Sequence, residues 1–183
     1  MTRMLSRVPM SDWVLRTAQA MDDARGADDA AWRKHWADSY WALGGTSDSV
    51  AHKGCPRTAA YGLWYLEWLK GSSRPLLDWP VQRVRDGLGK NAAYAAIAAR
   101  LLARAGVAQS HGTLWTRVRQ QFQRDTGEKA SNSDQGAVRL ALLLFLRGML
   151  AVPPVSASDS PGHGRICNGT AELRADSRHS HTA

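Results

Sequence analysis

Residues 56–71 read PRTAAYGLWYLEWLKG, and this stretch indicates the fold class more clearly than any other part of the chain. Pro56 is favoured in the first turn of a helix, because its missing N–H group would have no partner there, and Gly71 is a typical residue at a helix end. Positions 59–69 are apolar nearly all round, which is the pattern of a helix that is covered on every side. The stretch therefore predicts a central helix from Pro56 to Gly71.

Apolar residues recur at helical spacing on both sides of this central helix, and no segment alternates as a strand would. Glycines and helix-capping residues divide the pattern into separate helices. Besides the central helix we expect helices at 11–26, 28–44, 91–105, from Thr113 onward and at 133–150, with a short helical turn at 81–88. The sequence thus predicts an all-α protein, a compact bundle of about six helices.

The order of the expected helices contains a loose repeat. A Trp-bearing helix followed by a very apolar helix occurs twice, ending first in Leu69-Lys70-Gly71 and then in Leu146-Arg147-Gly148. Two repeated three-helix units would produce this order, and so would helix packing alone. We expect a flexible N-terminus at 1–10, one helical domain at 11–151 and a disordered tail at 152–183, where apolar periodicity ends.

A motif at the start of the central helix carries a family resemblance. The matching residues are Lys53-Gly54-Cys55-Pro56 with Ala59, Gly62 and Leu63, then Asn91, Tyr94-Ala95 and Ala98, and finally Leu114-Trp115. With these residues the chain resembles, over roughly residues 11–150, an uncharacterised family of small all-helical bacterial proteins. The resemblance implies fold and extent but no chemistry. The Trp64/Trp68 pair and the Pro-rich loop after Gly71 depart from the family pattern.

The net charge of +8 is concentrated in residues 70–124, which we call the basic segment. This segment holds ten Lys and Arg against two Asp and Glu, whereas acidic and basic residues balance in both flanks. Because polyanions bind basic surfaces, the segment predicts a non-enzymatic protein that contacts nucleic acid or a nucleoprotein complex. The expected contact residues are Arg83, Arg85, Lys90, Arg100, Arg104, Arg117, Arg119 and Arg124, of which we expect Arg100 and Arg104 to be exposed.

Two other functions compete with this interpretation. Most of the eight Trp should lie in the core, but so rich a set leaves one or two for the surface, and Trp64, Trp68 and Trp79 are candidates for exposed anchors of a protein–protein adaptor or inhibitor. Core packing explains Trp64 more simply. Cys55 stands before a helix start, where the helix dipole favours a thiolate, and is the one candidate for a catalytic thiol. Packing of a small residue before Pro56 explains Cys55 more simply.

Other chemistry finds little support in the sequence. The acidic and His residues lack the spacing of metal ligands, and Gly87–Asn91 lacks the features of a phosphate-binding loop, so we expect no metal and no cofactor. The longest apolar run, 140–146, is far shorter than the roughly 20 residues of a membrane span. With two Cys and no secretion signal, we expect a cytoplasmic protein without a membrane partner.

Overall fold

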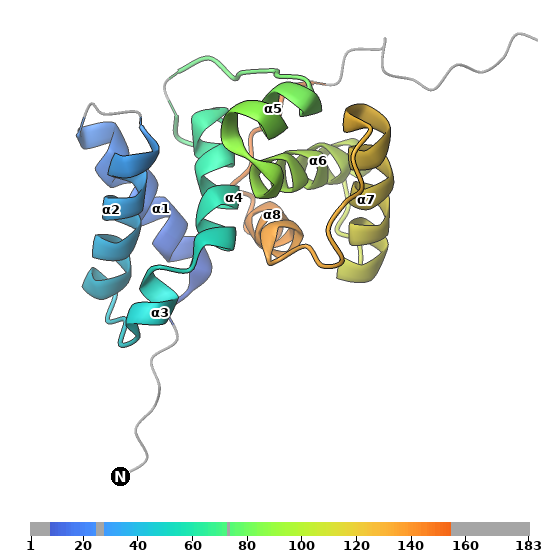
Figure 1. Ribbon diagram of the computed structural model, residues 1–183. Coiled ribbons are helices and arrows are strands. Elements are labelled where there is room, and N and C mark those ends of the chain that lie inside the picture. The colour runs from blue at the N-terminus through green and yellow to red at the C-terminus, as the bar shows by residue number, and fades with distance from the viewer. Residues whose placement is uncertain (1–7, 25–27, 73, 155–183) are drawn as a thin grey trace, which may run out of the picture.

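The computed structural model describes residues 8–24, 28–72 and 74–154, and these residues form an all-α bundle, as predicted (Figure 1). Its helices are α1 (Met10–Asp23), α2 (Asp29–Ala42), α3 (Asp48–Ala51), α4 (Gly54–Tyr65), α5 (Val81–Leu88), α6 (Lys90–Ala105), α7 (His111–Thr126) and α8 (Ala137–Leu146). The expected tail lies outside the described residues beyond Pro154. The expected flexible N-terminus lies outside them up to position 7, but Val8 and Met10 pack against the core, so the domain begins earlier than predicted.

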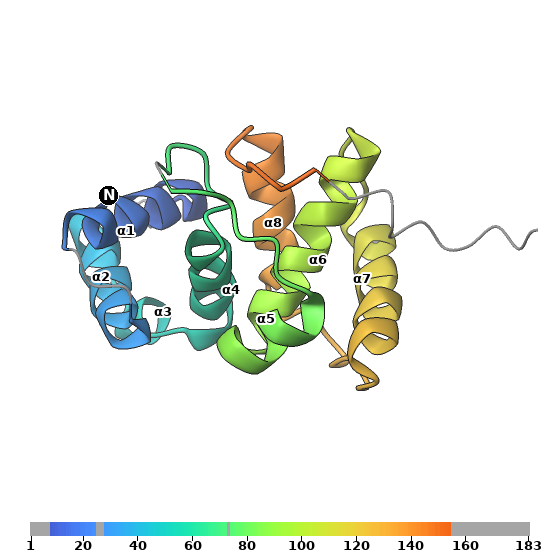
Figure 2. The ribbon, with the colours of Figure 1, turned by 90° about the horizontal axis from the view of Figure 1, so that it is seen from above.

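The bundle is elongated, with α2 and α7 at opposite ends (Figure 2). Between them α4 packs closely along α6, which also packs on α8, while α5 lies across α6 and touches α4 and α7. In Figure 1, α5 and the loop before it run over the top of α4 and α6. Because α5 lies in this position, a groove remains between α5, α6 and α7.

The core changes character along the bundle. Around α1, α2 and α4 it consists of stacked aromatic rings, with the Trp13 ring 4.1 Å from that of Trp36 and the Trp32 ring 5.3 Å from that of Trp64. Around α6 it consists of small side chains, since Ala residues fill most of positions 92–99 and all of these positions are buried. Small side chains let helix axes approach, which is why α4, α6 and α8 lie so close together.

The central helix is shorter than predicted, because α4 ends at Tyr65 and not at Gly71. Glu67 has φ 64°, a left-handed conformation that stops a helix, and the N–H of Trp68 then donates to the carbonyl of Leu63 at 2.9 Å. The apolar pattern continued past this point because Trp68 and Leu69 are buried after the chain has left the helix. The predicted helix was therefore too long, because these buried residues after Tyr65 continue the apolar pattern without being helical.

Other helix boundaries differ by a few residues for local reasons. α7 begins at His111 because Ser110 caps it, its Oγ accepting from the N–H of Thr113. α8 is confined to 137–146, since Gly136 and Gly148 both have positive φ. The short helix α3 was not predicted; it has only four residues.

The loose repeat keeps a spacing of about 81 positions in the order of the helices, but the packing does not repeat, because α6 packs closely on α8 whereas α1 and α4 scarcely touch. Leu69 forms an isolated antiparallel β-bridge with Leu150, and these two residues are equivalent under that spacing. Lys70 N–H donates to Met149 O, and Ala151 N–H donates to Trp68 O, both at 2.9 Å. Each of the six buried residues of α1 has a buried residue 81 positions later in α6. The pairs are Ser11 and Ala92, Trp13 and Tyr94, Val14 and Ala95, Thr17 and Ala98, Ala18 and Ala99, and Met21 and Leu102. The helix order α1, α2, α4 therefore recurs as α6, α7, α8, and we call these two sets of helices the two helical units.

Candidate nucleic-acid interface

A groove of about 810 Å³ lies between α5, α6 and α7. Arginines from two helices line it, Arg100 and Arg104 from α6 and Arg117 and Arg124 from α7. We call this set the arginine groove. Its lining is completed by Asp78, Pro80, Val81, Gln82, Ile97, Leu101, Gln120, Gln121 and Asp125. The structure therefore brings together four of the eight residues that the sequence proposed for nucleic-acid contact.

Helical spacing explains how these side chains reach one groove. Arg100 and Arg104 are one turn apart on α6, and Arg117 and Arg124 are two turns apart on α7, so each pair shares one face of its helix. The positions between the α7 arginines on that face are Gln120 and Gln121. This polar stripe was missed in the sequence, although its spacing of three, four and seven residues was the signal that could have found it.

Arg100 has a structural role, and the expectation that its side chain is exposed is wrong. Its side chain is only 17% exposed; it forms an ion pair with Asp78 at 2.6 Å and donates to the backbone carbonyl of Trp79 at 2.7 Å. The guanidinium also lies 5.0 Å from the centroid of the Trp68 ring. Arg100 thus fixes the loop before α5 to α6 and shapes one wall of the groove.

The two groove arginines of α7, Arg117 and Arg124, have neutral partners. Arg117 donates to Gln109 Oε1 at 2.9 Å, and Arg124 donates to Gln121 Oε1 at 3.0 Å, and both side chains are exposed. A glutamine holds the guanidinium in position without cancelling its charge, which leaves the charge to act on an incoming anion. Asp125, which also lines the groove, accepts a hydrogen bond from Gln121 at 2.7 Å.

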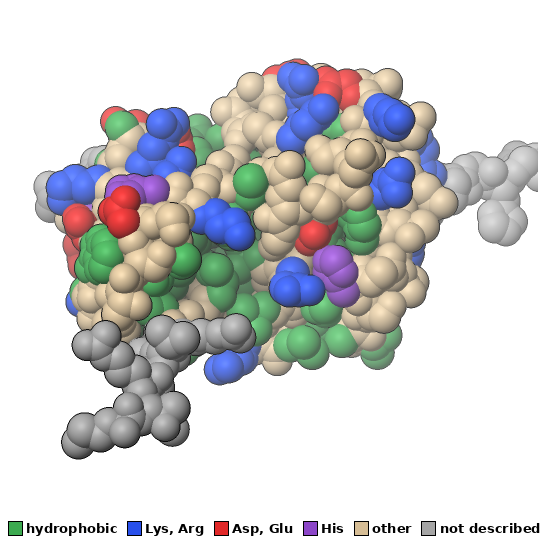
Figure 3. All heavy atoms as spheres, turned by 60° about the horizontal axis from the view of Figure 1, so that its bottom comes forward, with side chains coloured by type: hydrophobic (Ala, Val, Ile, Leu, Met, Phe, Trp, Pro, Cys, Tyr) green, Lys and Arg blue, Asp and Glu red, His purple; other side chains and the backbone are tan. Residues whose placement is uncertain are grey.

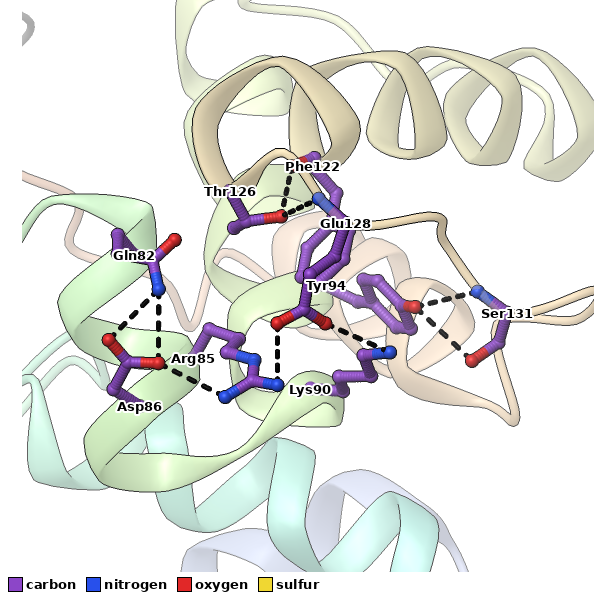
Figure 4. Close-up of polar contacts among 9 residues, drawn as sticks. All are labelled: Gln82, Arg85, Asp86, Lys90, Tyr94, Phe122, Thr126, Glu128 and Ser131. Carbon is purple, nitrogen blue, oxygen red and sulfur yellow. Dashed lines mark hydrogen bonds and ion pairs between the residues drawn. The ribbon is translucent and has the colours of Figure 1, made fainter.

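Arg85 and Lys90 lie in a different cluster (Figure 4). The Glu128 carboxylate, in the loop after α7, pairs with Arg85 at 2.5 Å and with Lys90 at 3.1 Å, while Arg85 also contacts Asp86. Nearby, the Tyr94 hydroxyl accepts from the N–H of Ser131 at 2.8 Å. These contacts tie the loop between α7 and α8 to α5 and α6, so both charges are compensated inside the protein.

The remaining two predicted cations lie outside the groove lining. The Arg83 guanidinium is 4.0 Å from the centroid of the Trp79 ring, and that of Arg119 is 6.0 Å from the centroid of Trp115. On the face shown in Figure 3, Lys and Arg side chains are dispersed, and a smaller number of acidic side chains lie among them. The basic segment therefore does not make that face uniformly positive.

The expectation of exposed Trp anchors is wrong for Trp64 and Trp68, both of which are buried. Trp64 belongs to the aromatic core and its Nε1–H donates to Asp22, while Trp68 donates to the carbonyl of Leu77. Trp79 is half-buried beneath Arg83. The Trp that is 43% exposed is Trp41, which lies beside the buried stripe of α2 and not on it.

The thiol of Cys55 is held in a polar contact. It donates to Gln135 Oε1 at 2.9 Å, and Asn91 Nδ2 approaches the same oxygen at 3.4 Å. Two of the three described imidazoles are engaged elsewhere: His52 pairs with Asp48 at 3.3 Å and His111 with Asp134 at 3.1 Å. A nucleophilic thiol needs a base in contact, and the hydrogen-bond partner of Cys55 among the described residues is the amide of Gln135.

Asp134 links α7 to α8 through its carboxylate. Its Oδ2 accepts from the N–H groups of Val138 and Arg139 and lies 3.1 Å from His111 Nε2. Burial raises the pKa of Asp134, but the hydrogen bonds from His111 and from backbone N–H groups, with the attraction of a charged His111, outweigh burial and hold that pKa below its ordinary value. This arrangement is a structural link, since Asp134 caps α8.

The described residues also bear on metal binding and on membrane insertion. Among residues 8–24, 28–72 and 74–154, no group of three or more His, Cys, Asp and Glu side chains is placed to hold a metal ion. In the same part of the chain, every helix is too short or too polar to cross a bilayer. Comparisons of the chain with protein-family models, with curated proteins and with solved structures return no match. The family resemblance of the Lys53–Pro56 motif therefore stays a prediction.

Proposed function

We propose that this protein binds nucleic acid through the arginine groove. The observation that carries the proposal is that Arg100, Arg104, Arg117 and Arg124, which come from two different helices, line one groove. Among the described lining residues, arginines outnumber the two carboxylates, Asp78 and Asp125. Guanidinium groups suit phosphate oxygens because their planar fork of N–H groups donates to two oxygens at once.

The local contacts support roles for individual residues. Arg117 and Arg124 are exposed and have neutral glutamine partners, so phosphate can approach them without first displacing a carboxylate. Arg100 is held by Asp78 and Trp79, and we assign it to positioning the groove wall. Because each phosphate contact releases condensed counterions, binding should weaken steeply as salt rises.

The experiment is a fluorescence-anisotropy titration of a labelled oligonucleotide with the full chain. The test variant is Arg117→Glu/Arg124→Glu, and the matched control is Arg119→Glu/Arg147→Glu, which changes the total charge equally at exposed positions outside the groove. We expect the test variant to lose roughly tenfold or more in affinity and the control to lose far less. Equal losses in both variants, or no binding by the parent protein at about 50 mM salt, would refute the proposal.

The adaptor and thiol-enzyme hypotheses have less support than nucleic-acid binding. Of the three anchors of the adaptor hypothesis, Trp79 is the one that is not fully buried. If that hypothesis is right, Trp79→Ala should abolish binding to a protein partner and leave nucleic-acid binding unchanged. The thiol-enzyme hypothesis lacks a base at Cys55 among the contacts that the described residues make. Neither has an observation comparable to the arginine groove.

A further inference from the structure

We infer that the arginine groove accepts a single strand of nucleic acid and not a duplex. This inference rests on the proposed function and specifies the form of its ligand. It follows from the shape of the groove, from where its carboxylates lie and from the amide groups along its wall.

The shape of the site is concave. The arginines of α6 and α7 line the same hollow, and its apolar lining includes Val81, Ile97 and Leu101. Proteins read duplex DNA with a projecting helix or ribbon that enters a groove of the duplex, because the phosphates lie on the outside of a convex cylinder. A hollow of about 810 Å³ is the reverse of such a projection. A positively charged groove that follows one backbone is the usual arrangement for single strands.

The carboxylates in the lining favour the same ligand. Asp78 comes from the loop before α5 and Asp125 from near the end of α7, so acidic groups border the arginines from two elements. The charge of Asp78 is balanced by Arg100, whereas Asp125 has a neutral partner, so the second strand of a duplex would add repulsion from Asp125. A single backbone that follows Arg117 and Arg124 along α7 brings fewer phosphates near Asp125 than a duplex does.

The lining also offers groups that bind bases. Gln120 is exposed on α7 between the two arginines, and Gln82 and Gln121 line the groove as well. A glutamine amide both donates and accepts, which matches the hydrogen-bonding edge of an unpaired base. No aromatic side chain is among the described lining residues, so bases would stack on guanidinium planes. We therefore expect modest affinity and little base preference.

The experiment compares three labelled probes of about 12 nucleotides, a single-stranded DNA, the RNA of the same sequence and the corresponding DNA duplex. Each is titrated with the full chain at about 50 mM and about 200 mM salt. We expect both single strands to bind roughly tenfold more tightly than the duplex, and Gln120→Ala to lower single-strand affinity a few-fold with no change for the duplex.

The outcomes separate this inference from the proposed function. A duplex that binds as tightly as the single strands, with both lost in Arg117→Glu/Arg124→Glu, overturns the single-strand inference and leaves the proposed function standing. Absence of binding to all three probes at the lower salt overturns both. Inorganic polyphosphate that competes as well as the single strands, at equal total charge, also overturns the inference, because the groove would then recognise charge without bases.

Discussion

Gly62 of α4 lies directly against Ala92 of α6. A Cβ atom built on Gly62 would be 2.4 Å from the Cβ of Ala92 and 3.0 Å from its Cα, well inside the distance at which carbon atoms can pack. The closest helix pair of the bundle therefore depends on the absence of one methyl group. Because α6 carries two of the groove arginines, this contact also sets where the groove stands relative to α4.

Gly62→Ala should destabilise the fold by about 1–3 kcal/mol, the usual cost of forcing a methyl group into a packed contact. Gly112→Ala is the control, since a Cβ there meets no atom within 4 Å and α7 should gain from replacement of a helical glycine. Denaturant unfolding followed by circular dichroism measures both. A stability of Gly62→Ala equal to that of Gly112→Ala would contradict the close contact.

Asp134→Asn should reduce the loss of stability at acidic pH. The pKa of Asp134 is lower in the folded state than the ordinary value of about 3.9, so the carboxylate stabilises the fold above that value. This contribution is lost as pH falls from there through the lower folded pKa, and the variant lacks it. Thermal unfolding between about pH 6 and pH 2 should show the two proteins converging at the acidic end. Parallel curves would contradict the assignment.

Glu128→Gln should lower the free energy of unfolding by about 1 kcal/mol or more, because it leaves Arg85 and Lys90 without their shared carboxylate. A double-mutant cycle with Lys90→Met isolates the pair with Lys90. We expect the second substitution to cost less in the Glu128→Gln background than in the parent. Fully additive effects would show that the Glu128–Lys90 ion pair contributes nothing measurable.

Gly148→Ala should lower the free energy of unfolding by about 1 kcal/mol, because position 148 has φ 64°, where an L side chain is strained.

The residue 81 positions before Gly148 is Glu67, which also has φ 64°. Its carboxylate pairs with Arg74 at 2.6 Å and accepts a hydrogen bond from Ser72. These contacts are lost in Glu67→Gly even as strain is relieved, so we expect that variant to gain no stability. Chemical denaturation measures both variants, and a clear gain in Glu67→Gly would contradict a role for its contacts.

Cys55→Ser should leave both the fold and oligonucleotide binding nearly unchanged. A serine hydroxyl can donate to Gln135 as the thiol does, and Cys55 is not among the residues that line the arginine groove. Thermal unfolding and the anisotropy titration test the two parts. Loss of a biological effect at an unchanged melting temperature would instead revive the thiol-enzyme hypothesis.

The sequence predicted the fold class because helical periodicity is a local signal, carried by residues such as Val14, Ala18 and Met21 of α1. It overextended the central helix because Trp68 and Leu69 are buried for a non-local reason, the bridge to residues 149–151. The basic segment pointed to the arginines of the groove. It did not show that Asp78 pairs with Arg100, or that Glu128 pairs with Arg85 and Lys90. Those two acids come from loops, whose positions depend on tertiary contacts and leave no periodic pattern.

The bridge between Leu69 and Leu150 joins equivalent positions of the two helical units, and its two hydrogen bonds exchange places when the units are exchanged. This is the geometry of an isologous contact, the kind that joins identical subunits about a two-fold axis. The chain thus carries within itself the type of interface that a homodimer would form. The backbone groups of Lys70 and Ala151 that form these two hydrogen bonds are thereby paired within the chain.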